Sequence, residues 1–394
     1  MIDLELPDYL QELRTNIHSL SKSMFRPISR KYDIAEHEYP KELDVFRKMN
    51  VMGSLKKSKK KGKTGSEGSF KVNLTTVLAT EELAWGDVAL MMSIPNAAPG
   101  NASINAIANE KQMEEFGDKW AAFSITEPNS GSDPGSIITT AVRDGCEWVL
   151  NGEKIFVTCA ERSDIVVVWA TIDKNLGKEG IKPFIVPKGT PGLELTKLES
   201  KMGLRASDTG GFVLNNCRIP IDSILGSAEK EVSAEGFKGV MKTFDNTRPI
   251  VGAMATGVAR AALDFVKEEF EKNGINLDYN ANLNNISSIE REYYLMDAHI
   301  EALRLLSWRA AWMADSGEFN NVEASMAKAK GGRCGTLITQ KCCELLGYLG
   351  YSQKYLVEKW MRDSKILDIF EGTGQIQHLI IARDVLGLSG RDLK

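Results

Sequence analysis

The hydrophobic period of this chain changes twice, and these changes restrict its fold more than any other feature. Apolar residues recur every three or four positions near the start, alternate with polar ones in the middle, and return to helical spacing from about residue 233. The pattern predicts an α+β fold with an N-terminal helical domain (1–119), a middle β domain (120–230) and a C-terminal helical bundle (231–394). A chain of 394 residues is also too long for one compact core.

The first region contains two clear helical patterns and one interruption. Leu10, Leu13 and Ile17 fall on one helical face, and a second helical pattern covers 75–85. Between them, six of the eight residues in 56–63 are lysines, a composition that cannot nucleate a core. We expect a solvated loop there, with contact to a CoA phosphate or an acidic redox partner as the alternative interpretation.

The middle region has the alternation of strands. Two apolar-rich runs flank Asn151-Gly152, a dipeptide that accepts the positive φ angles of a type I′ hairpin turn, so we expect a hairpin there. Further strands are expected at 165–172, 184–187, 193–197 and 211–219. Several short strands at this spacing predict a small barrel or sandwich.

The third region is helical again. Asn246 or Thr247 can cap a helix that has Pro249 in its first turn and runs to Lys272. A second long helix is expected to present one apolar face, made of Leu295, Ala298, Ala302, Leu305, Trp308 and Trp312. A four-helix bundle is the simplest arrangement of these elements.

Composition and charge exclude several classes of function. The 49 basic residues are balanced by 53 acidic ones, so no overall positive field exists to hold nucleic acid. We expect no membrane span and no signal peptide, since the apolar runs are short and the acidic residues Asp3, Glu5 and Asp8 follow Met1. The six cysteines show no metal-binding spacing and no disulfide framework, so we expect no metal site, and buried thiols in the reducing cytoplasm.

Two segments concentrate polar side chains, glycines and acids beyond what turns require. One extends from Phe123 to Asp133 and contains TEPNSGSD, and the other, 369–377, reads IFEGTGQIQ. With LNGEKIFVT, KMGLRASDTGGFVLNNCRIP, FDNTRP and VEKWMRDSKI in family order, they make the chain resemble the acyl-CoA dehydrogenase family over nearly its whole length. No P-loop, Rossmann glycine fingerprint, HExxH or nucleophile elbow competes with this resemblance.

The resemblance implies bound FAD and oxidation of an acyl-CoA thioester to its 2,3-enoyl form. The α-carbon of a thioester is a very weak acid, so its proton leaves only to a nearby base and with a stabilised enolate oxygen. Glu371 matches the family's base, and Gly372 beside it lets the backbone approach the ligand. In the family the amide N–H of the base, with a ribityl hydroxyl of the flavin, binds the thioester oxygen. A helix-end carboxylate is the alternative for Glu371.

Further residues carry over one by one. The positions that match flavin contacts are Phe123, Ile125, Thr126, Gly131, Ser132, Phe156 (often Trp in the family), Thr158, Thr373 and Gln375. The positions that match the substrate side are Ser132, Phe244, Asp245, Thr247 and Arg248. A cation in the first turn of a helix opposes the helix dipole, so we expect Arg248 to serve an outside anion. For Thr126 and Ser132 the alternative is a turn hydrogen bond.

Two family elements that reach across a dimer to the neighbour's FAD are altered. An Arg-x-x-Phe-Gly motif is replaced by residues 271–280, and a Gln-x-x-Gly-Gly-x-Gly motif has Glu344 and Tyr348 in place of its amide and one of its glycines. A lost cation, a gained acid and a bulky ring all disfavour a neighbour's pyrophosphate. We therefore expect an asymmetric complex, α2β2, with a homologous dehydrogenase subunit, or a homo-oligomer with altered FAD contacts.

Three other functions share these motifs. The base and flavin contacts do not encode the electron acceptor, so the same fold serves an enoyl-CoA reductase or an oxidase as well as a dehydrogenase that passes electrons to electron-transfer flavoprotein. A non-catalytic scaffold subunit is the third alternative, and the presence of Glu371 argues against it. The motifs do not encode the acyl group.

Overall fold

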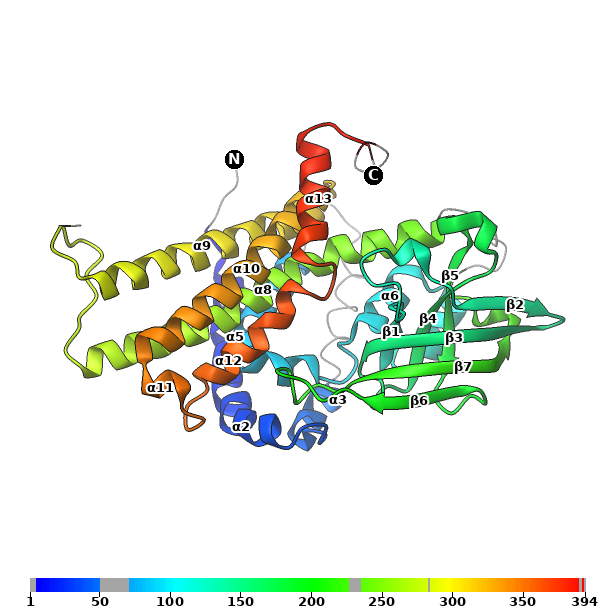
Figure 1. Cartoon of the computed structure of the whole chain (residues 1–394), viewed down its shortest axis with the longest axis horizontal. Coiled ribbons are helices and arrows are strands. Elements are labelled where there is room, and N and C mark those ends of the chain that lie inside the picture. The colour runs from blue at the N-terminus through cyan, green and yellow to red at the C-terminus, as the bar shows by residue number, and fades with distance from the viewer. Residues whose placement is uncertain (1–4, 50–70, 227–234, 283, 390–391, 393–394) are drawn as a thin grey trace.

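The computed structural model describes residues 5–49, 71–226, 235–282, 284–389 and 392. Most helices occupy one end of the molecule and the strands the other, where α6 lies beside them, and α8 extends from the strands into the helices (Figure 1). The three-region order predicted from the hydrophobic period is confirmed. The lysine segment 56–63 lies outside the described residues, and so do both interpretations of it.

The N-terminal helices gather around α5, whose residues are mostly buried. The helices are α1 (Asp8–Leu20), α2 (Arg26–Ile34), α3 (Asp44–Met49), α5 (Val72–Met92), α6 (Pro99–Ile107) and α7 (Glu110–Phe116), and a π-helical turn, Ser21–Phe25, joins α1 to α2. Asp87 interrupts α5 with extended backbone angles. Because α5 packs against both α8 and α9, it connects the N-terminal helices to the C-terminal bundle.

The middle region forms a seven-stranded sheet in the order β1-β4-β2-β3-β7-β6, with β5 paired to β4. The strands are β1 (Ala121–Ser124), β2 (Thr140–Asp144), β3 (Glu147–Thr158), β4 (Ile165–Thr171), β5 (Ile181–Pro187), β6 (Leu193–Leu198) and β7 (Thr209–Pro220). β4 runs parallel to β1 and antiparallel to β5. The four strands expected after the Asn-Gly pair are confirmed, with boundaries shifted by up to three residues.

The expected hairpin turn at Asn151-Gly152 is wrong. β3 continues through this dipeptide because both of its halves pair with the long strand β7, and only the register shifts there. Gly152 has φ +154°, and a Cβ on it would lie 2.4 Å from the hydroxyl oxygen of Thr139, so close approach requires the glycine. The hairpin turn lies earlier, between Asp144 and Glu147, where β2 meets β3.

The C-terminal region consists of three long helices and shorter ones packed on them. They are α8 (Glu235–Lys272), α9 (Ser288–Asp315), α10 (Asn321–Leu346), α11 (Tyr348–Tyr351), α12 (Val357–Ser364) and α13 (Gly374–Val385). The expected helix start at Asn246 or Thr247 is wrong, because α8 begins at Glu235 and contains Pro249 in its interior. Contacts with β5 support this N-terminal extension of α8, which its sequence alone does not signal.

One stretch of α8, Thr247–Lys272, is long and apolar enough to cross a membrane by length and composition. Within the described residues it is the core helix of the bundle, since 72% of its most apolar window is buried by the rest of the chain. Burial between α5, α9 and α10 explains its composition.

The apolar face expected on α9 is only partly the buried one, since Leu305, Trp308 and Trp312 are half-buried. Buried positions on this helix include Tyr293, Met296, Ile300 and Leu303, whereas Leu295 is 51% exposed. The expected face and the buried face are neighbours on α9, and both carry apolar residues. Periodicity alone therefore could not predict which of the two faces is buried. All six thiols are free, and Cys146 is exposed against expectation, because it lies in the turn between β2 and β3.

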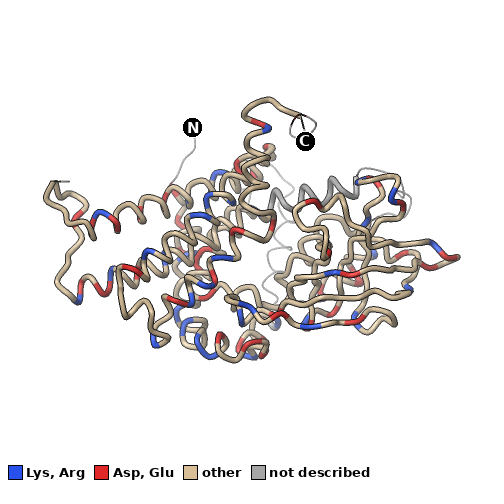
Figure 2. Tube along the Cα trace, in the orientation of Figure 1, with Lys and Arg blue, Asp and Glu red and all other residues tan. Residues whose placement is uncertain are grey.

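Buried charges connect the helices through networks. Glu81 and Glu82 of α5 accept hydrogen bonds from Arg260 of α8, and Glu81 also accepts them from Arg304 of α9. Figure 2 shows acidic and basic segments close together where these helices meet. Each guanidinium therefore compensates a carboxylate that burial would otherwise penalise.

A second network contains a buried lysine. Lys359 of α12 forms ion pairs with Asp87 at 2.7 Å and with Asp363 at 2.5 Å, and all three side chains are 0% exposed. The remaining carboxylate oxygens accept from Leu90 N and Leu204 N. The network therefore fixes the break in α5 against α12, and it holds the loop before β7 in place.

We predict that Lys359→Met strongly destabilises the protein. The substitution leaves the carboxylates of Asp87 and Asp363 buried without their cation, which costs about 3–5 kcal/mol of unfolding free energy. Urea unfolding measures this loss as a lower midpoint. Lys354→Met, on the exposed loop before α12, is the control and should leave the midpoint unchanged. Equal midpoints for the two variants would contradict a stabilising role for the network.

Candidate active site

Glu371 lies in a turn between the 3-10 segment Lys365–Asp368 and α13. Its φ is +57°, which is unusual for a residue with a side chain, and Gly372 follows at +87°. The buried amide of Gln377 holds this turn, since Nε2 donates to the carbonyl oxygens of Glu371 (3.3 Å) and Gly372 (3.2 Å). A Cβ on Gly372 would lie 2.5 Å from Nε2, so both the conformation and the close contact require glycine.

The side chain of Glu371 is directed to α8. Thr247 Oγ1 donates to Glu371 Oε2 at 2.8 Å. Burial raises the pKa of the Glu371 carboxyl, and this outweighs the opposite effects of the Thr247 hydrogen bond and of the charges of Arg248 and Lys328. The amide N–H of Glu371 makes no hydrogen bond to any residue that the structure describes. Glu371 thus offers a carboxylate of raised basicity beside a backbone donor.

Arg248 is in the middle of α8, not in a first turn, so the expected conflict with the helix dipole does not arise. Its guanidinium is 5% exposed and donates from Nη1 to Asn321 Oδ1 at 2.9 Å and to Ser325 Oγ at 3.5 Å. Arg248 therefore connects α8 to α10 and contributes positive charge near Glu371.

The middle region presents an aromatic ring to solvent. Phe156 has φ +56° at an irregularity where β3 shifts its register on β7, and its side chain is 62% exposed. Its neighbour Ile155 donates its N–H to Thr126 O at 2.9 Å, so the exposed ring is next to the chain that follows β1. The irregularity turns outward a ring that a regular strand position would not expose.

Two threonine hydroxyls near this ring have no hydrogen-bond partner among the described residues. Neither Thr126 nor Thr158 makes a side-chain hydrogen bond among the described residues, while Ile125 is buried and Phe123 packs on Trp169 with ring centroids 6.0 Å apart. An exposed ring beside free hydroxyl donors fits a planar heterocycle that carries nitrogen and oxygen acceptors. These residues thus fit the isoalloxazine of FAD.

A buried ion pair supports this segment from within. Lys154 is 0% exposed, and its Nζ lies 2.7 Å from Glu127 Oε1 and 3.1 Å from Ile125 O. Burial opposes ionisation of Glu127, but Lys154 and the amides of Ile138 and Thr139 outweigh it and hold the pKa of Glu127 below its usual value. Burial lowers the pKa of Lys154 to about 8. The pair sets the position of the chain on both sides of Thr126.

The other predicted residues have varied surroundings. Gly131 and Ser132 are exposed in a bend, and nothing lies within 4 Å of a Cβ built on Gly131. Thr373 caps α13 by accepting from Ile376 N, and Gln375 is exposed in the first turn of that helix. Phe244 and Asp245 belong to α8, but their side chains lie outside the described residues.

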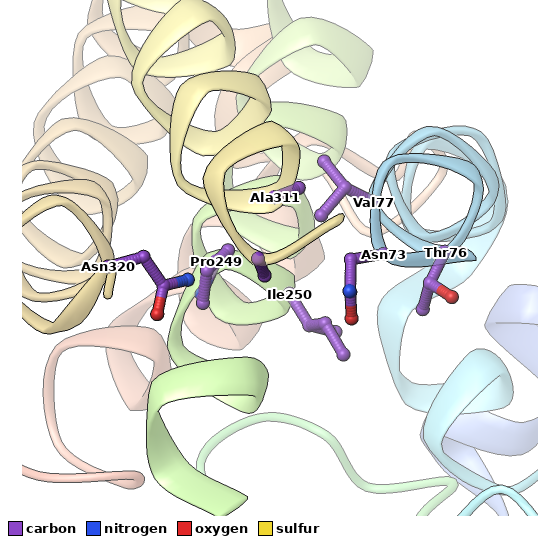
Figure 3. Close-up of a pocket in the computed structure, with 8 residues that line it drawn as sticks. Asn73, Thr76, Val77, Pro249, Ile250, Ala311 and Asn320 are labelled. Carbon is purple, nitrogen blue, oxygen red and sulfur yellow. The ribbon is translucent and has the colours of Figure 1, made fainter. Parts of the chain in front are cut away.

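The structure therefore brings the predicted residues together in two groups. Thr247, Glu371 and Gly372 form one, and Ile125, Thr126 and Phe156 form the other. α8 carries Thr247 and also packs against β5 of the sheet that contains the second group. A small hollow of about 10 Å³ lies where α5, α8, α9 and the start of α10 meet (Figure 3), but Glu371 does not line it.

Sequence reasoning missed several residues that shape this site. Lys154 and Gln377 lie inside the quoted motifs. The strand position of Lys154 and the helix position of Gln377 did not indicate contacts with other segments. Ser325 and Asn321 of α10 have no sequence signal, since only the packing of α10 on α8 brings them to Arg248. Lysines such as Lys154 are rarely buried without a partner, so its burial in the structure indicates a role in shaping the site.

Three family models match the chain. The N-terminal, middle and C-terminal domains of acyl-CoA dehydrogenase match residues 7–123, 122–217 and 234–386. Together they cover nearly all of the chain in the order that the hydrophobic period predicted.

Individual relatives agree with these matches. The short-chain specific acyl-CoA dehydrogenase of Bos taurus mitochondria is 34% identical over 390 residues, 97% of this chain and 91% of that protein. An acryloyl-CoA reductase (NADH) of Anaerotignum propionicum is 32% identical over 98% of this chain and 96% of its own. The structure of butyryl-CoA dehydrogenase from Megasphaera elsdenii is 31% identical with a TM-score of 0.84, covering 98% and 100% of the two chains. The chain belongs to the acyl-CoA dehydrogenase family and is an FAD-dependent flavoprotein oxidoreductase.

Proposed function

We propose that this protein oxidises an acyl-CoA thioester to the 2,3-enoyl-CoA, with Glu371 as the base that removes the α-proton. The observation that carries this proposal is the Glu371 turn, in which a desolvated carboxylate and an amide N–H without a described partner belong to one residue. A short-chain acyl-CoA dehydrogenase among the relatives supports the reaction class, and the acyl group remains open.

The carboxylate of Glu371 suits a base in a protected site. Burial raises its pKa, which strengthens it as a base while Thr247 keeps it oriented through a hydrogen bond of 2.8 Å. The positive φ of Glu371 and Gly372, held by Gln377, fixes the side chain relative to its own amide. The residue needs this rigidity because proton transfer depends on alignment within a few tenths of an ångström.

The amide N–H of Glu371 is assigned to the thioester oxygen. Charge develops on that oxygen as the α-proton leaves, and a backbone donor that is already in place stabilises it without reorganisation. Gly372 allows the close backbone approach that this contact needs. Glu371 would thus act on both the α-proton, through its carboxylate, and the thioester oxygen, through its amide N–H.

The flavin residues are assigned to the second group. When bound, FAD would supply an acceptor for the β-hydrogen, which leaves as hydride. Phe156 stacks, Thr126 and Thr158 donate hydrogen bonds, Phe123 and Ile125 line the ring, and Gly131 and Ser132 leave room at the bend. Thr373 and Gln375 at the start of α13 face the FAD phosphates. Ser132, Phe244, Asp245, Thr247 and Arg248 form the substrate side.

We propose that a homologous subunit completes the FAD site in an α2β2 complex, because the parts that this chain would lend to a neighbour are altered. Tyr348, which replaces a family glycine, is 81% exposed on α11, and Glu344 is paired with Lys341 at 2.8 Å. A ring and an acid at these positions disfavour a neighbour's pyrophosphate. A homo-oligomer is the alternative, and electron-transfer flavoprotein is the assigned acceptor. Free thiols are consistent with the cytoplasm.

An enoyl-CoA reductase is the second candidate, favoured by the similarity to an acryloyl-CoA reductase. Anaerobic reduction of electron-transfer flavoprotein by acyl-CoA supports the dehydrogenase. NADH-dependent reduction of an enoyl-CoA supports the reductase, and peroxide formation in air supports an oxidase.

We predict that Glu371→Gln abolishes reduction of the flavin by acyl-CoA. The amide keeps the size and the contact with Thr247 but cannot take the α-proton, so the rate of flavin bleaching should fall about a thousandfold. Anaerobic stopped-flow absorbance measures this rate, and the FAD content of the variant serves as the control. A rate within tenfold of the parent protein would contradict the assignment and revive the scaffold interpretation.

We predict that the acid limb of the pH–rate profile lies above the usual pKa of a glutamate. The base must be ionised, and burial raises its pKa, so the rate rises with pH through this raised value. Thr247→Val removes a donor that favours the carboxylate and should move the limb upward by about one pH unit. Thr247→Ser keeps the hydroxyl and should leave the limb in place. A limb unaffected by the valine variant would show that another group titrates.

We predict that the chain purified alone contains well below one FAD per chain. The exposed Tyr348 and the acidic Glu344 cannot replace the family's contacts to a neighbour's FAD. Absorbance of the released flavin against protein concentration measures the occupancy, and co-expression with a homologous subunit should raise it. Full occupancy in the isolated chain would remove the argument for a heteromer.

A further inference from the structure

Lys328 of α10 is a fully buried cation without a described partner. Its side chain is 0% exposed, and its Nζ makes no hydrogen bond among the described residues. Burial of an unpaired ammonium opposes folding strongly, and native chains rarely retain one. The other two fully buried lysines of the described chain, Lys154 and Lys359, both have carboxylate partners within 2.7 Å.

The packing of α10 places Lys328 beside the catalytic turn. Ser325, Lys328 and Gly332 follow each other at spacings of three and four, so they share one face of the helix. Ser325 contacts Arg248, the neighbour of Thr247, and a Cβ on Gly332 would lie 2.6 Å from Asp368 at the start of the Glu371 turn. Lys328 therefore lies between the α8 and α13 sides of the site.

Charged groups on three neighbouring segments act on Lys328. Arg248 of α8 opposes its charge, whereas Asp368 of the 3-10 segment and Glu371 of the turn favour it. Burial lowers the pKa of Lys328 to about 8, so the amine remains protonated at neutral pH. Its charge in turn lowers the pKa of the Glu371 carboxyl against the larger effect of burial.

We propose that Lys328 is a positioning residue that keeps Glu371 ionised, and therefore able to act as a base, in its desolvated turn. This inference rests on the proposed role of Glu371. Arg248 is less suited to the task, because Asn321 and Ser325 already engage its guanidinium. The ammonium of Lys328 has no hydrogen-bond partner among the described residues, so no such contact offsets its charge beside Asp368 and Glu371.

Lys328→Met tests this inference through the pH dependence of flavin reduction in the FAD-loaded protein. Loss of the positive charge should raise the pKa of Glu371 and move the acid limb upward by about one pH unit or more. Flavin reduction should then be about tenfold slower below the limb and recover at alkaline pH. Lys328→Arg keeps the positive charge and should leave the acid limb where it is in the parent protein. Lys330→Met, on another face of α10, loses the same charge and is the control.

Stability and a direct titration separate this role from a structural one. Met fills the volume without an unsatisfied amine, so Lys328→Met should unfold at the same or a higher urea concentration. Glu371 is also titrated by ¹³C NMR of carboxyl-labelled glutamate, with Glu371→Gln identifying its signal. Should the Met variant not fold, Lys328→Gln replaces it in both measurements.

An unchanged Glu371 titration in the charge-free variant overturns the inference, as does a uniform rate loss at all pH values. The NMR titration needs no substrate. If none of the thioesters tested bleaches the flavin of the parent protein while the Glu371 signal shifts as expected, the proposed function fails and the electrostatic role of Lys328 stands.

Discussion

The partial burial of one carboxylate, Glu371, without loss of its ability to ionise, is the constraint on which the candidate site depends. Burial penalises the charge of Glu371, while a hydroxyl of α8 and cations from α8 and α10 offset part of that penalty. The balance leaves a stronger base than an exposed glutamate, held rigidly by a strained turn. Two helices, α8 and α10, and the turn before α13 must meet for this balance to exist, so the packing of the bundle sets the properties of the candidate base.

Buried ion pairs perform related work elsewhere in the molecule. The Lys154–Glu127 pair sets the loop after β1 against β3, next to the exposed Phe156, and the Lys359 network joins α12 to the break in α5. Such pairs contribute little net stability over apolar packing, but each defines one geometry, because any displacement leaves a charge uncompensated. The same reasoning makes Lys328 unusual, since its compensation within the described residues comes from the more distant carboxylates of the site.

Two positions that differ from the family's across-dimer motif, Glu344 and Tyr348, lie at the surface. Tyr348 of α11 is largely exposed, and Glu344 pairs with Lys341 at the surface of α10. These surfaces do not contribute to the Glu371 turn or to the group around Thr126. The residues proposed as base and flavin contacts are present, while the exposed positions Glu344 and Tyr348 differ from the family motif, and this contrast is the basis of the proposed α2β2 complex.

The sequence by itself determined the order of helical and β regions, the family, and the motifs that contain Glu371, Thr247 and the flavin residues, because these depend on period and on short spacing. Tertiary structure decided whether Asn151-Gly152 turns or continues, where α8 begins, and which stripe of α9 is buried, because pairing with β7, packing on β5 and neighbouring helices override local preference. It also decided the electrostatics of the site. No local pattern indicates that Lys328 is buried without a described partner, since that follows only from the packing of α10 against segments distant in the chain.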